Sequence, residues 1–215
     1  MFASDSDRPR AAVLHSGGLD STVCLLMAQE EEKDVISIGI DYGQRHRIEL
    51  EYANYQCSRF GIPRRVIKVE WDKPARELPL DRTVDEIKSS VSSAFLPGRN
   101  MVFLALGIAE AAGLGAKELW IGVNSIDFSG YPDCSPEFVT SFSEMLRYGV
   151  PKGPAIRAPL QLLTKPEIVA IAKRLSLSSG DTWSCYRPNF SGGGVNACGR
   201  CDACKLHEHA WGVAN

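Results

Sequence analysis

Short apolar runs alternate along this chain with longer stretches in which apolar residues recur at helical spacing. The runs have the length of strands, and they are predicted at 11–14, 35–40, 66–69 and 119–123. The periodic stretches predict helices after the Gly-rich segment at 16–18 and at 49–60, 100–112, 136–148 and 164–175. Strands that alternate with helices predict an α/β fold with a Rossmann-like, doubly wound parallel sheet, whose ligand site lies beyond the carboxyl ends of the strands.

Local signals mark the ends of several predicted helices. Gly61 is placed to end the second helix, because glycine readily takes the left-handed conformation of a helix terminus. Ser135 is placed to cap the fourth helix, which has a proline in its first turn. Thr164 and Glu167 have the spacing of a capping box and open the last of these helices.

The segment 71–98 is rich in proline, serine and charged residues and shows no sustained period. We predict a long surface excursion there, of the kind that often has a function. The chain has no internal repeat or long linker, and only its Cys-rich tail departs in composition. We therefore predict one main domain over 11–180 and a small C-terminal region over 181–215.

Composition and charge exclude several classes of protein. The 215 residues include 24 Lys and Arg against 26 Asp and Glu, so the net charge of -2 excludes a basic protein that coats nucleic acid. No apolar run approaches the roughly 20 residues that a membrane helix needs. Residues 1–10 are polar and lack the apolar core of a signal peptide, so we expect a cytoplasmic protein.

The seven cysteines are the unusual feature of the composition. Cys185, Cys198, Cys201 and Cys204 lie in the last fifth of the chain, and the last three form two overlapping C-x-x-C units. In a reducing compartment such a cluster indicates metal binding rather than disulfides. Four thiolates predict one structural Zn²⁺ ion per chain.

Three alternatives stay open for this cluster. An iron–sulfur cluster also uses C-x-x-C-x-x-C spacing. His207 or His209 would replace one cysteine in a second alternative, although single histidines on a terminal helix more often lie in solvent. In the third, no metal is bound. Of the other cysteines, Cys24 and Cys57 fall on predicted core positions of helices.

Residues 16–21, with the sequence Ser-Gly-Gly-Leu-Asp-Ser, lie where a strand passes into a helix. Exposed N–H groups and the positive end of the helix dipole meet at such a point, which favours phosphate binding. The hydroxyls of Ser16, Ser21 and Thr22 can donate further hydrogen bonds, and Asp20 is placed to cap the helix or hold Mg²⁺. The string is neither a Walker loop nor G-x-G-x-x-G. A Gly-rich turn without a ligand is the alternative.

This string resembles the S-G-G-x-D-S pyrophosphate loop of the ATP pyrophosphatase families, which adenylate an oxygen and release pyrophosphate. The resemblance implies an adenine nucleotide alpha hydrolase-like fold that binds ATP with Mg²⁺. It assigns to ATP the residues Ser16, Gly17, Gly18, Leu19, Asp20, Ser21 and Thr22. Asp41 and Tyr42 follow the second strand, where the sugar or base of ATP would lie. Arg99 and Lys165 are the cations best placed to neutralise pyrophosphate and, with Asp20, are the candidate catalytic residues, although each cation alone is as often a solvated surface charge.

Four further strings occur: D-Y-G-Q-R-H at 41–46, P-G-R-N at 97–100, D-F-S-G-Y-P-D-C at 127–134 and T-W-S-C-Y at 182–186. With the loop and the cysteines, they make the chain from about residue 11 to 206 similar to the 7-cyano-7-deazaguanine synthase family. The resemblance implies a C–N ligase of queuosine biosynthesis that converts 7-carboxy-7-deazaguanine and ammonia into the nitrile. The implied route consumes ATP through an adenylated acid and an amide, without direct binding of nucleic acid, in a homodimer.

The same resemblance assigns parts of the chain to substrate binding. It makes 11–180 a nucleotide-binding domain of the ATP pyrophosphatase type and 181–215 a zinc-binding region. Tyr131, Asp133 and Cys134 follow a predicted strand and are expected over the cleft, where Asp133 would accept hydrogen bonds from the deazaguanine. Cys134 as a small buried residue is the alternative.

Three departures from the family pattern leave other functions open. Ser135 and His207 stand where the family usually has arginine, and Pro188 to Asn196 lengthen the interval between the first two metal-binding cysteines. These changes suit family members in antiviral defence, which are thought to join 7-carboxy-7-deazaguanine by an amide bond to a protein N-terminus. A nucleotide-binding module without turnover and a sulfur transferase that uses Cys134 are further alternatives.

Overall fold

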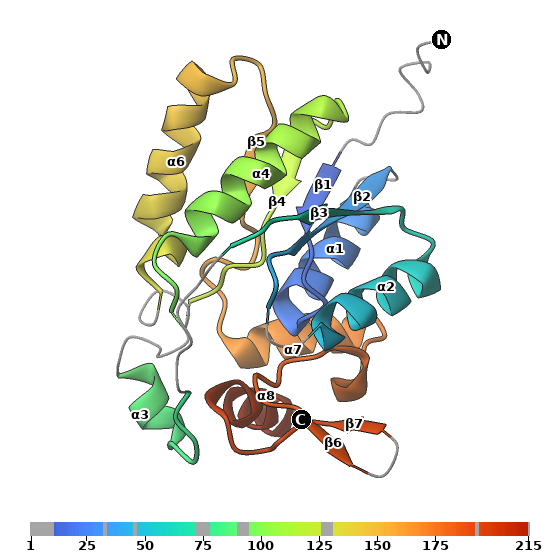
Figure 1. Ribbon diagram of the computed structural model, residues 1–215, viewed down its shortest axis with the longest axis vertical. Coiled ribbons are helices and arrows are strands. Elements are labelled where there is room, and N and C mark those ends of the chain that lie inside the picture. The colour runs from blue at the N-terminus through green and yellow to red at the C-terminus, as the bar shows by residue number, and fades with distance from the viewer. Residues whose placement is uncertain are drawn as a thin grey trace.

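The computed structural model describes residues 11–31, 34–44, 47–71, 78–89, 95–125, 131–191 and 194–214. Five parallel strands form its main sheet in the order β3-β2-β1-β4-β5 (Figure 1). The strands are β1 (Ala11–Leu14), β2 (Val35–Asp41), β3 (Arg64–Lys68), β4 (Glu118–Trp120) and β5 (Ala155–Arg157). Because the chain winds outward from β1 in both directions, the carboxyl ends of β1 and β4 lie at the switch point of the sheet, where such folds bind ligands.

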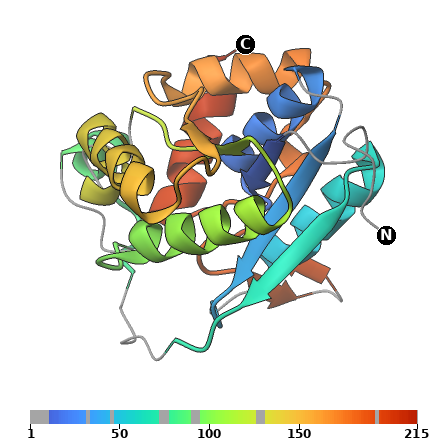
Figure 2. The ribbon, with the colours of Figure 1, turned by 90° about the horizontal axis from the view of Figure 1, so that it is seen from above.

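Helices cover both faces of this sheet (Figure 2). They are α1 (Leu19–Glu31), α2 (Ile48–Phe60), α3 (Val84–Lys88), α4 (Arg99–Gly113), α6 (Pro136–Gly149), α7 (Lys165–Arg174) and α8 (Asp202–Val213). The core on one face joins the strands to α1, α2, α7 and α8, and the core on the other joins them to α4 and α6. The predicted doubly wound α/β fold is confirmed.

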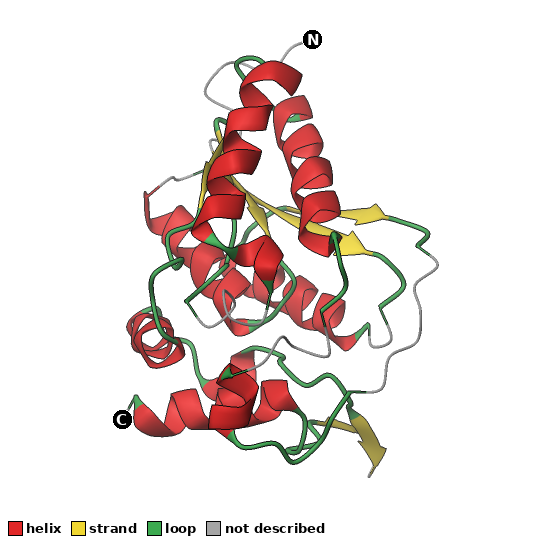
Figure 3. Ribbon diagram, turned by 90° about the vertical axis from the view of Figure 1, so that its left-hand side faces the viewer, coloured by secondary structure: helices red, strands yellow, loops and turns green. Residues whose placement is uncertain are grey.

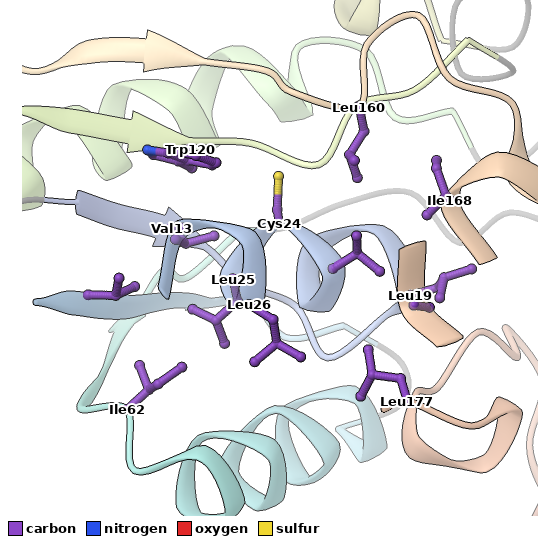
Figure 4. Packing of buried hydrophobic residues seen from close by; sticks show 14 of the residues in the cluster. Val13, Leu19, Cys24, Leu25, Leu26, Ile62, Trp120, Leu160, Ile168 and Leu177 are labelled. Carbon is purple, nitrogen blue, oxygen red and sulfur yellow. The ribbon is translucent and has the colours of Figure 1, made fainter. Parts of the chain in front are cut away.

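The first of these cores is apolar and closely packed (Figure 4). Its fully buried side chains include Val13, Leu25, Trp120, Leu160 and Ile168. Cys24 and Cys57 also lie in it, at 0% and 4% exposure, as predicted for helix core positions. Burial of each large apolar side chain stabilises the fold by about 2 kcal/mol.

The helix ends follow the sequence signals closely. Gly61 ends α2 with φ of 67° in the left-handed region. The Ser135 hydroxyl accepts a hydrogen bond from the Phe138 N–H at the start of α6. The Glu167 carboxylate accepts hydrogen bonds from the backbone N–H and the hydroxyl of Thr164. These local interactions fix where each helix begins or ends.

The strand predictions need correction at two places. β3 begins at Arg64, two residues before the predicted start, and β4 is only Glu118–Trp120 rather than 119–123. β5 was not predicted, because its three residues are too few to show a pattern. Periodicity identifies a run of apolar side chains, whereas a strand is defined by backbone pairing that polar residues such as Arg64 also make.

The segment predicted as an excursion contains an ordered part that packs on the C-terminal region. Thr83 opens α3 with a capping box to Glu86. Leu80 pairs with Cys201 in an isolated bridge, and Arg82 forms an ion pair with Asp202. Residues 78–89 lie mostly at the surface, as predicted, but they also form a helix and pair with residues more than a hundred positions further along the chain, which the sequence pattern did not predict.

The C-terminal region contains α8 and a hairpin of β6 (Asn189–Ser191) and β7 (Gly194–Asn196), which lie together at one end of the molecule (Figures 1 and 3). Ala210 of α8 is fully buried in the core that includes α1 and α7. Trp183 donates its backbone N–H to the carbonyl of Gly17 over 3.1 Å. No helix in the described parts of the chain is long and apolar enough to cross a membrane.

Candidate active site

The Gly-rich loop joins β1 to α1 at the switch point of the sheet. The Ser21 hydroxyl accepts a hydrogen bond from the Ser16 N–H over 3.2 Å, and the Thr22 hydroxyl donates to the Gly18 carbonyl over 2.7 Å. Ser16 is exposed, whereas Gly17 is buried with φ of 93°. A Cβ on Gly17 would lie 2.3 Å from the backbone oxygen of Glu49. Only glycine therefore fits where the loop crosses α2.

A buried polar network lies beneath this loop. The His15 ring nitrogens lie 3.0 Å from the Ser37 hydroxyl and 2.9 Å from the Gln56 side-chain oxygen, and Arg64 donates to the Ser37 hydroxyl over 2.6 Å. The Gln56 amide donates to the Gly17 carbonyl over 3.2 Å. Burial, together with the neighbouring Arg64 charge, lowers the pKa of His15 to about 3. A neutral imidazole thus supports the loop.

Asp20 and Lys165 meet beside the loop. Asp20 lies in the first turn of α1 and Lys165 in the first turn of α7, and their side chains form an ion pair. The Asn124 amide donates to the same Asp20 oxygen over 3.3 Å. The other Asp20 oxygen is buried and has no hydrogen-bond partner in the described structure. Lys165 is therefore held at the loop, and its side chain is only 17% exposed.

A second charged group gathers around Arg99 at the start of α4. Its guanidinium lies 5.8 Å from the centre of the Tyr131 ring and donates to the Tyr42 hydroxyl. The Tyr186 hydroxyl lies 3.5 Å from that of Tyr131. Burial raises the pKa of Glu49 to about 7, although the Arg99 charge opposes this shift. Arg99 is half-buried among neutral side chains and is not a solvated surface charge.

These groups face one large cavity of about 830 Å³. Its walls include the loop, Arg99 and the predicted substrate residues, namely Ser16, Gly18, Asp20, Ser21, Tyr42, Arg99, Tyr131, Asp133 and Cys134. Cavities of this size accept nucleotide-sized ligands. The structure therefore brings most of the predicted site residues to a single space at the switch point.

Other predicted site residues lie outside that cavity wall. The backbone of Gly17 packs against α2, and the Thr22 hydroxyl donates to the Gly18 carbonyl. Leu19 and Lys165 line a smaller neighbouring cavity. The Asp41 carboxylate accepts hydrogen bonds from Arg47 and from the Gly43 N–H rather than facing the large cavity. The part of the 127–134 string at 127–130 falls outside the described residues.

The predicted substrate residues are held by the start of α4. Asp133 accepts a hydrogen bond from the Asn100 backbone N–H over 3.0 Å, and the Cys134 sulfur accepts one from the Asn100 amide over 2.9 Å. Cys134 is 5% exposed but lines the cavity. It is thus both a small buried residue and part of the wall, so the two interpretations of Cys134 are compatible.

Four cysteines form the candidate metal centre. The sulfurs of Cys185, Cys198, Cys201 and Cys204 all lie within 4.8 Å of one another. The Cys201 and Cys204 sulfurs are 3.5 Å apart, and those of Cys198 and Cys204 are 4.0 Å apart. A tetrahedral Zn²⁺ with Zn–S bonds near 2.3 Å holds its sulfurs about 3.8 Å apart. These spacings fit one ion, whereas a cluster of several irons holds its cysteines farther apart.

The surroundings of the sulfurs also suit thiolates. Backbone N–H groups of Arg187 and Cys198 donate to the Cys185 sulfur over 3.3 and 3.2 Å. His207 is not part of the group; its ring nitrogen lies 3.3 Å from the Ser184 hydroxyl. The expectation that His207 lies in solvent is wrong, because the side chain is half-buried in α8. A four-cysteine site needs no histidine ligand.

The sequence patterns did not predict a role for Glu49 or the hydrogen-bond network of His15, Gln56 and Arg64. The only signal was a polar residue at position 15, between an apolar run and the glycines. Gln56, Arg64 and Glu49 lie in amphipathic stretches where charged and polar residues are common. Their roles depend on the crossing of α2 over the loop, which no local pattern predicts.

Fold and loop together define an α/β protein of the adenine nucleotide alpha hydrolase-like fold, with a Gly-rich loop at the switch point of its sheet. The family model described as "Queuosine biosynthesis protein QueC" matches residues 10–215. The 7-cyano-7-deazaguanine synthase 2 of Rhodopseudomonas palustris is 57% identical, with 95% of this chain and 97% of that protein covered. The 7-cyano-7-deazaguanine synthase of Novosphingobium aromaticivorans is 43% identical, with coverage of 94% and 89%. The chain belongs to the 7-cyano-7-deazaguanine synthase family.

Solved structures of lower identity show the fold alone. The U34-tRNA thiolase NcsA from Methanococcus maripaludis, solved with its [4Fe-4S] cluster, has a TM-score of 0.54 at 16% identity, with 98% of this chain and 67% of that chain covered. An NH3-dependent NAD synthetase from Campylobacter jejuni has a TM-score of 0.51 at 19% identity, with coverage of 82% and 68%.

Replacement of Gly17 by alanine will strongly destabilise the protein. The new methyl group lies against α2 backbone, which cannot move aside as a flexible side chain does, and φ is positive, so we expect a loss of about 3 kcal/mol or more. Thermal unfolding measures the effect. Gly149→Ala is the matched control, because nothing lies within 4 Å of its Cβ position. Equal melting temperatures of the two variants would contradict the packing argument.

Purified protein will be colourless and contain about one zinc ion per chain. Cys201→Ser removes a fully buried ligand and is expected to lose the metal and much of the stability of residues 181–215. Elemental analysis and thermal unfolding measure both effects. Cys24→Ser, outside the cluster, should keep its zinc. A brown protein that contains iron would overturn the assignment.

Stability will fall in mild acid partly through His15. Its pKa is about 3 when folded and 6.5 when unfolded, so below pH 6.5 the unfolded chain binds one more proton and the free energy of unfolding decreases as pH falls. From pH 7 to pH 5 this contributes about 2 kcal/mol. Denaturant titrations should show a smaller decrease for His15→Gln than for wild type or for the exposed control His209→Gln. Parallel curves for all three would contradict a buried neutral imidazole.

Proposed function

We propose that the protein makes 7-cyano-7-deazaguanine from 7-carboxy-7-deazaguanine and ammonia, with ATP consumed through an adenylated acid and an amide. The observation that carries this proposal is the single 830 Å³ cavity shared by the pyrophosphate loop and the Arg99 group. Relatives that cover nearly the whole chain are named for the synthesis of that nitrile. Membership of the family supports the reaction, and the shared cavity supports this location for it.

The chemistry requires activation of a poor electrophile. A carboxylate resists attack by an amine until its oxygen becomes part of a good leaving group, and transfer of AMP from ATP provides one. The exposed Ser16 and the start of α1 offer N–H and hydroxyl donors to the phosphates. Lys165, which contacts Asp20, and Arg99, on the wall of the same cavity as the loop, are the cations that neutralise charge on the departing pyrophosphate.

Asp20 is the residue proposed to hold Mg²⁺ with ATP. Its second carboxylate oxygen is buried without a hydrogen-bond partner in the described structure, so an oxygen ligand remains for a cation there. Mg²⁺ at this place supplies charge neutralisation of the phosphates. Lys165, on the first oxygen of Asp20, keeps the carboxylate oriented.

One site serves both rounds, because both activate an oxygen on the same carbon. In the first round AMP is transferred to the acid and ammonia displaces it to give the amide. In the second the amide oxygen is activated and lost with AMP, which leaves the nitrile. We propose that Tyr131, Asp133 and Cys134 hold the heterocycle throughout, with Asp133 accepting hydrogen bonds from its N–H groups.

No observation favours the antiviral alternative, in which a protein N-terminus replaces ammonia. That hypothesis needs a wider cavity mouth at Ser135 and at the insertion 188–196. Ser135 instead caps α6, and neither it nor any described residue of 188–196 lines the large cavity. We further propose cytoplasmic localisation, a homodimer, ammonia taken from solution and no direct contact with nucleic acid.

Incubation with ATP, Mg²⁺, 7-carboxy-7-deazaguanine and ammonium tests the function. We expect the nitrile, with two AMP released per nitrile because two oxygens are activated in turn. Chromatography with mass detection follows acid, amide and nitrile. Accumulation of amide alone, or of a protein conjugate, would support the antiviral alternative. Absence of AMP under all conditions would indicate a binding module without turnover.

A further inference from the structure

A smaller cavity of about 210 Å³ adjoins the large one. It lies between the first turn of α1, the segment at 183–186 and α8. The two cavities share five wall residues, namely Gly18, Asp20, Glu49, Tyr131 and Tyr186. A small molecule in this space therefore lies against residues that also line the large cavity.

The size and walls of the smaller cavity suit a small neutral molecule. It has a quarter of the volume of its neighbour, which is too little for a nucleotide or for a second large substrate beside the first. Apolar side chains such as Ile87, Trp183 and Leu206 form part of its walls. Three of its charged residues form ion pairs, since Lys165 binds Asp20 and Asp202 binds Arg82.

Glu49 lies in the wall between the two spaces. It belongs to the first turn of α2, directly over the Gly17 loop. Arg99, Tyr42 and Tyr186, from three other segments, interact electrostatically with its carboxyl group and line the large cavity with it. Because burial brings its pKa to about 7, the group can both take up and release a proton near neutral pH.

The other candidate bases that line the large cavity are already engaged in hydrogen bonds or ion pairs. Among the described residues that line it, Asp20 binds Lys165 and Asn124, and Asp133 accepts the Asn100 N–H. The His15 ring is buried and hydrogen-bonded beneath the loop, where its pKa of about 3 makes it a weak base. Glu49 is therefore the carboxylate best placed to exchange a proton with an incoming molecule.

We infer that the smaller cavity is the route by which ammonia reaches the activated carbon, and that Glu49 accepts the proton that the nitrogen loses. This inference rests on the proposed function. In amide formation the ammonia lone pair forms the C–N bond, the C–O bond to AMP breaks with its electron pair leaving on AMP, and one N–H proton passes to Glu49. The carboxyl group then releases that proton to solvent.

The second round uses the same group. Transfer of AMP to the amide oxygen releases pyrophosphate, and the nitrogen loses its first proton to solvent. The remaining nitrogen proton then passes to Glu49. The N–H electron pair becomes the third C–N bond, and the C–O electron pair leaves with AMP. One carboxylate therefore accepts a nitrogen proton in both rounds, as expected if the nitrogen occupies the same place each time.

The Glu49→Gln variant distinguishes adenylation of the substrate from attack by ammonia. The variant should keep acid-dependent exchange of pyrophosphate into ATP, measured without ammonium, within about threefold of wild type, because adenylation needs no base for nitrogen. Formation of amide and nitrile should fall by about 100-fold or more. Glu51→Gln, an exposed carboxylate on the same helix, is the matched control and should behave as wild type. Loss of exchange in Glu49→Gln, or wild-type nitrile formation, would overturn the inference.

Hydroxylamine provides a rescue test. It attacks acyl adenylates readily, and because its nitrogen is less basic than that of ammonia, the adduct loses its proton to water without a carboxylate. Glu49→Gln should therefore form the hydroxamate at a rate close to wild type while ammonia fails. Equal defects with both nucleophiles would show that Glu49 does not act on the nitrogen proton. Failure of the proposed function is distinguishable, because wild-type protein would then release no AMP with the acid.

Leu206→Trp tests the route by filling the smaller cavity from α8. The ammonium concentration for half-maximal rate should rise at least about 10-fold, while pyrophosphate exchange and zinc content stay unchanged. If the Leu206→Trp variant loses its zinc, the smaller substitution Leu206→Phe is tested instead. An unchanged ammonium dependence in a folded variant would overturn the route.

Discussion

The close crossing of α2 over the Gly17 backbone is the constraint on which the site depends. No side chain fits between Gly17 and the Glu49 carbonyl, so the loop has one shape and α2 one position. Gln56, two turns further along the same helix, then reaches the Gly17 carbonyl and the neutral His15 ring. The Gly-rich loop is thus held by backbone contact and by buried hydrogen bonds, both of which fix the shape of the part that lines the cavity.

The C-terminal region is tied to the same point. Trp183 donates to the Gly17 carbonyl, and its ring packs on Tyr52 of α2 with ring centres 5.4 Å apart. Trp183 also belongs to the buried cluster that contains Cys185 and Cys201. A structural metal among these cysteines would therefore stabilise the wall of both cavities as well as the tail. This explains how a region with little core of its own can contribute to a site built on the sheet.

Sequence patterns identified the architecture and the chemistry-bearing strings, but not how they meet. The parallel sheet, the loop and the four cysteines are local features, and each has a period or spacing that can be recognised. The network of His15, Ser37, Gln56 and Arg64 joins four separate segments, and each residue alone resembles an ordinary polar position. β5 and α3 are short, so partners elsewhere in the chain, rather than their own patterns, determine them.

The charged residues of the site also affect one another. The chain is slightly acidic, yet Arg99 lies on the cavity wall and Lys165 contacts Asp20 of the loop, so on the proposed function attraction for an anionic substrate is local. Arg99 lies among neutral tyrosines and opposes the upward pKa shift of Glu49. An anion bound to Arg99 would weaken that opposition, because it screens the positive charge from the carboxyl group. On the proposed assignment, Glu49 therefore becomes a stronger base once phosphate occupies the site, which couples proton acceptance to the presence of the activated substrate.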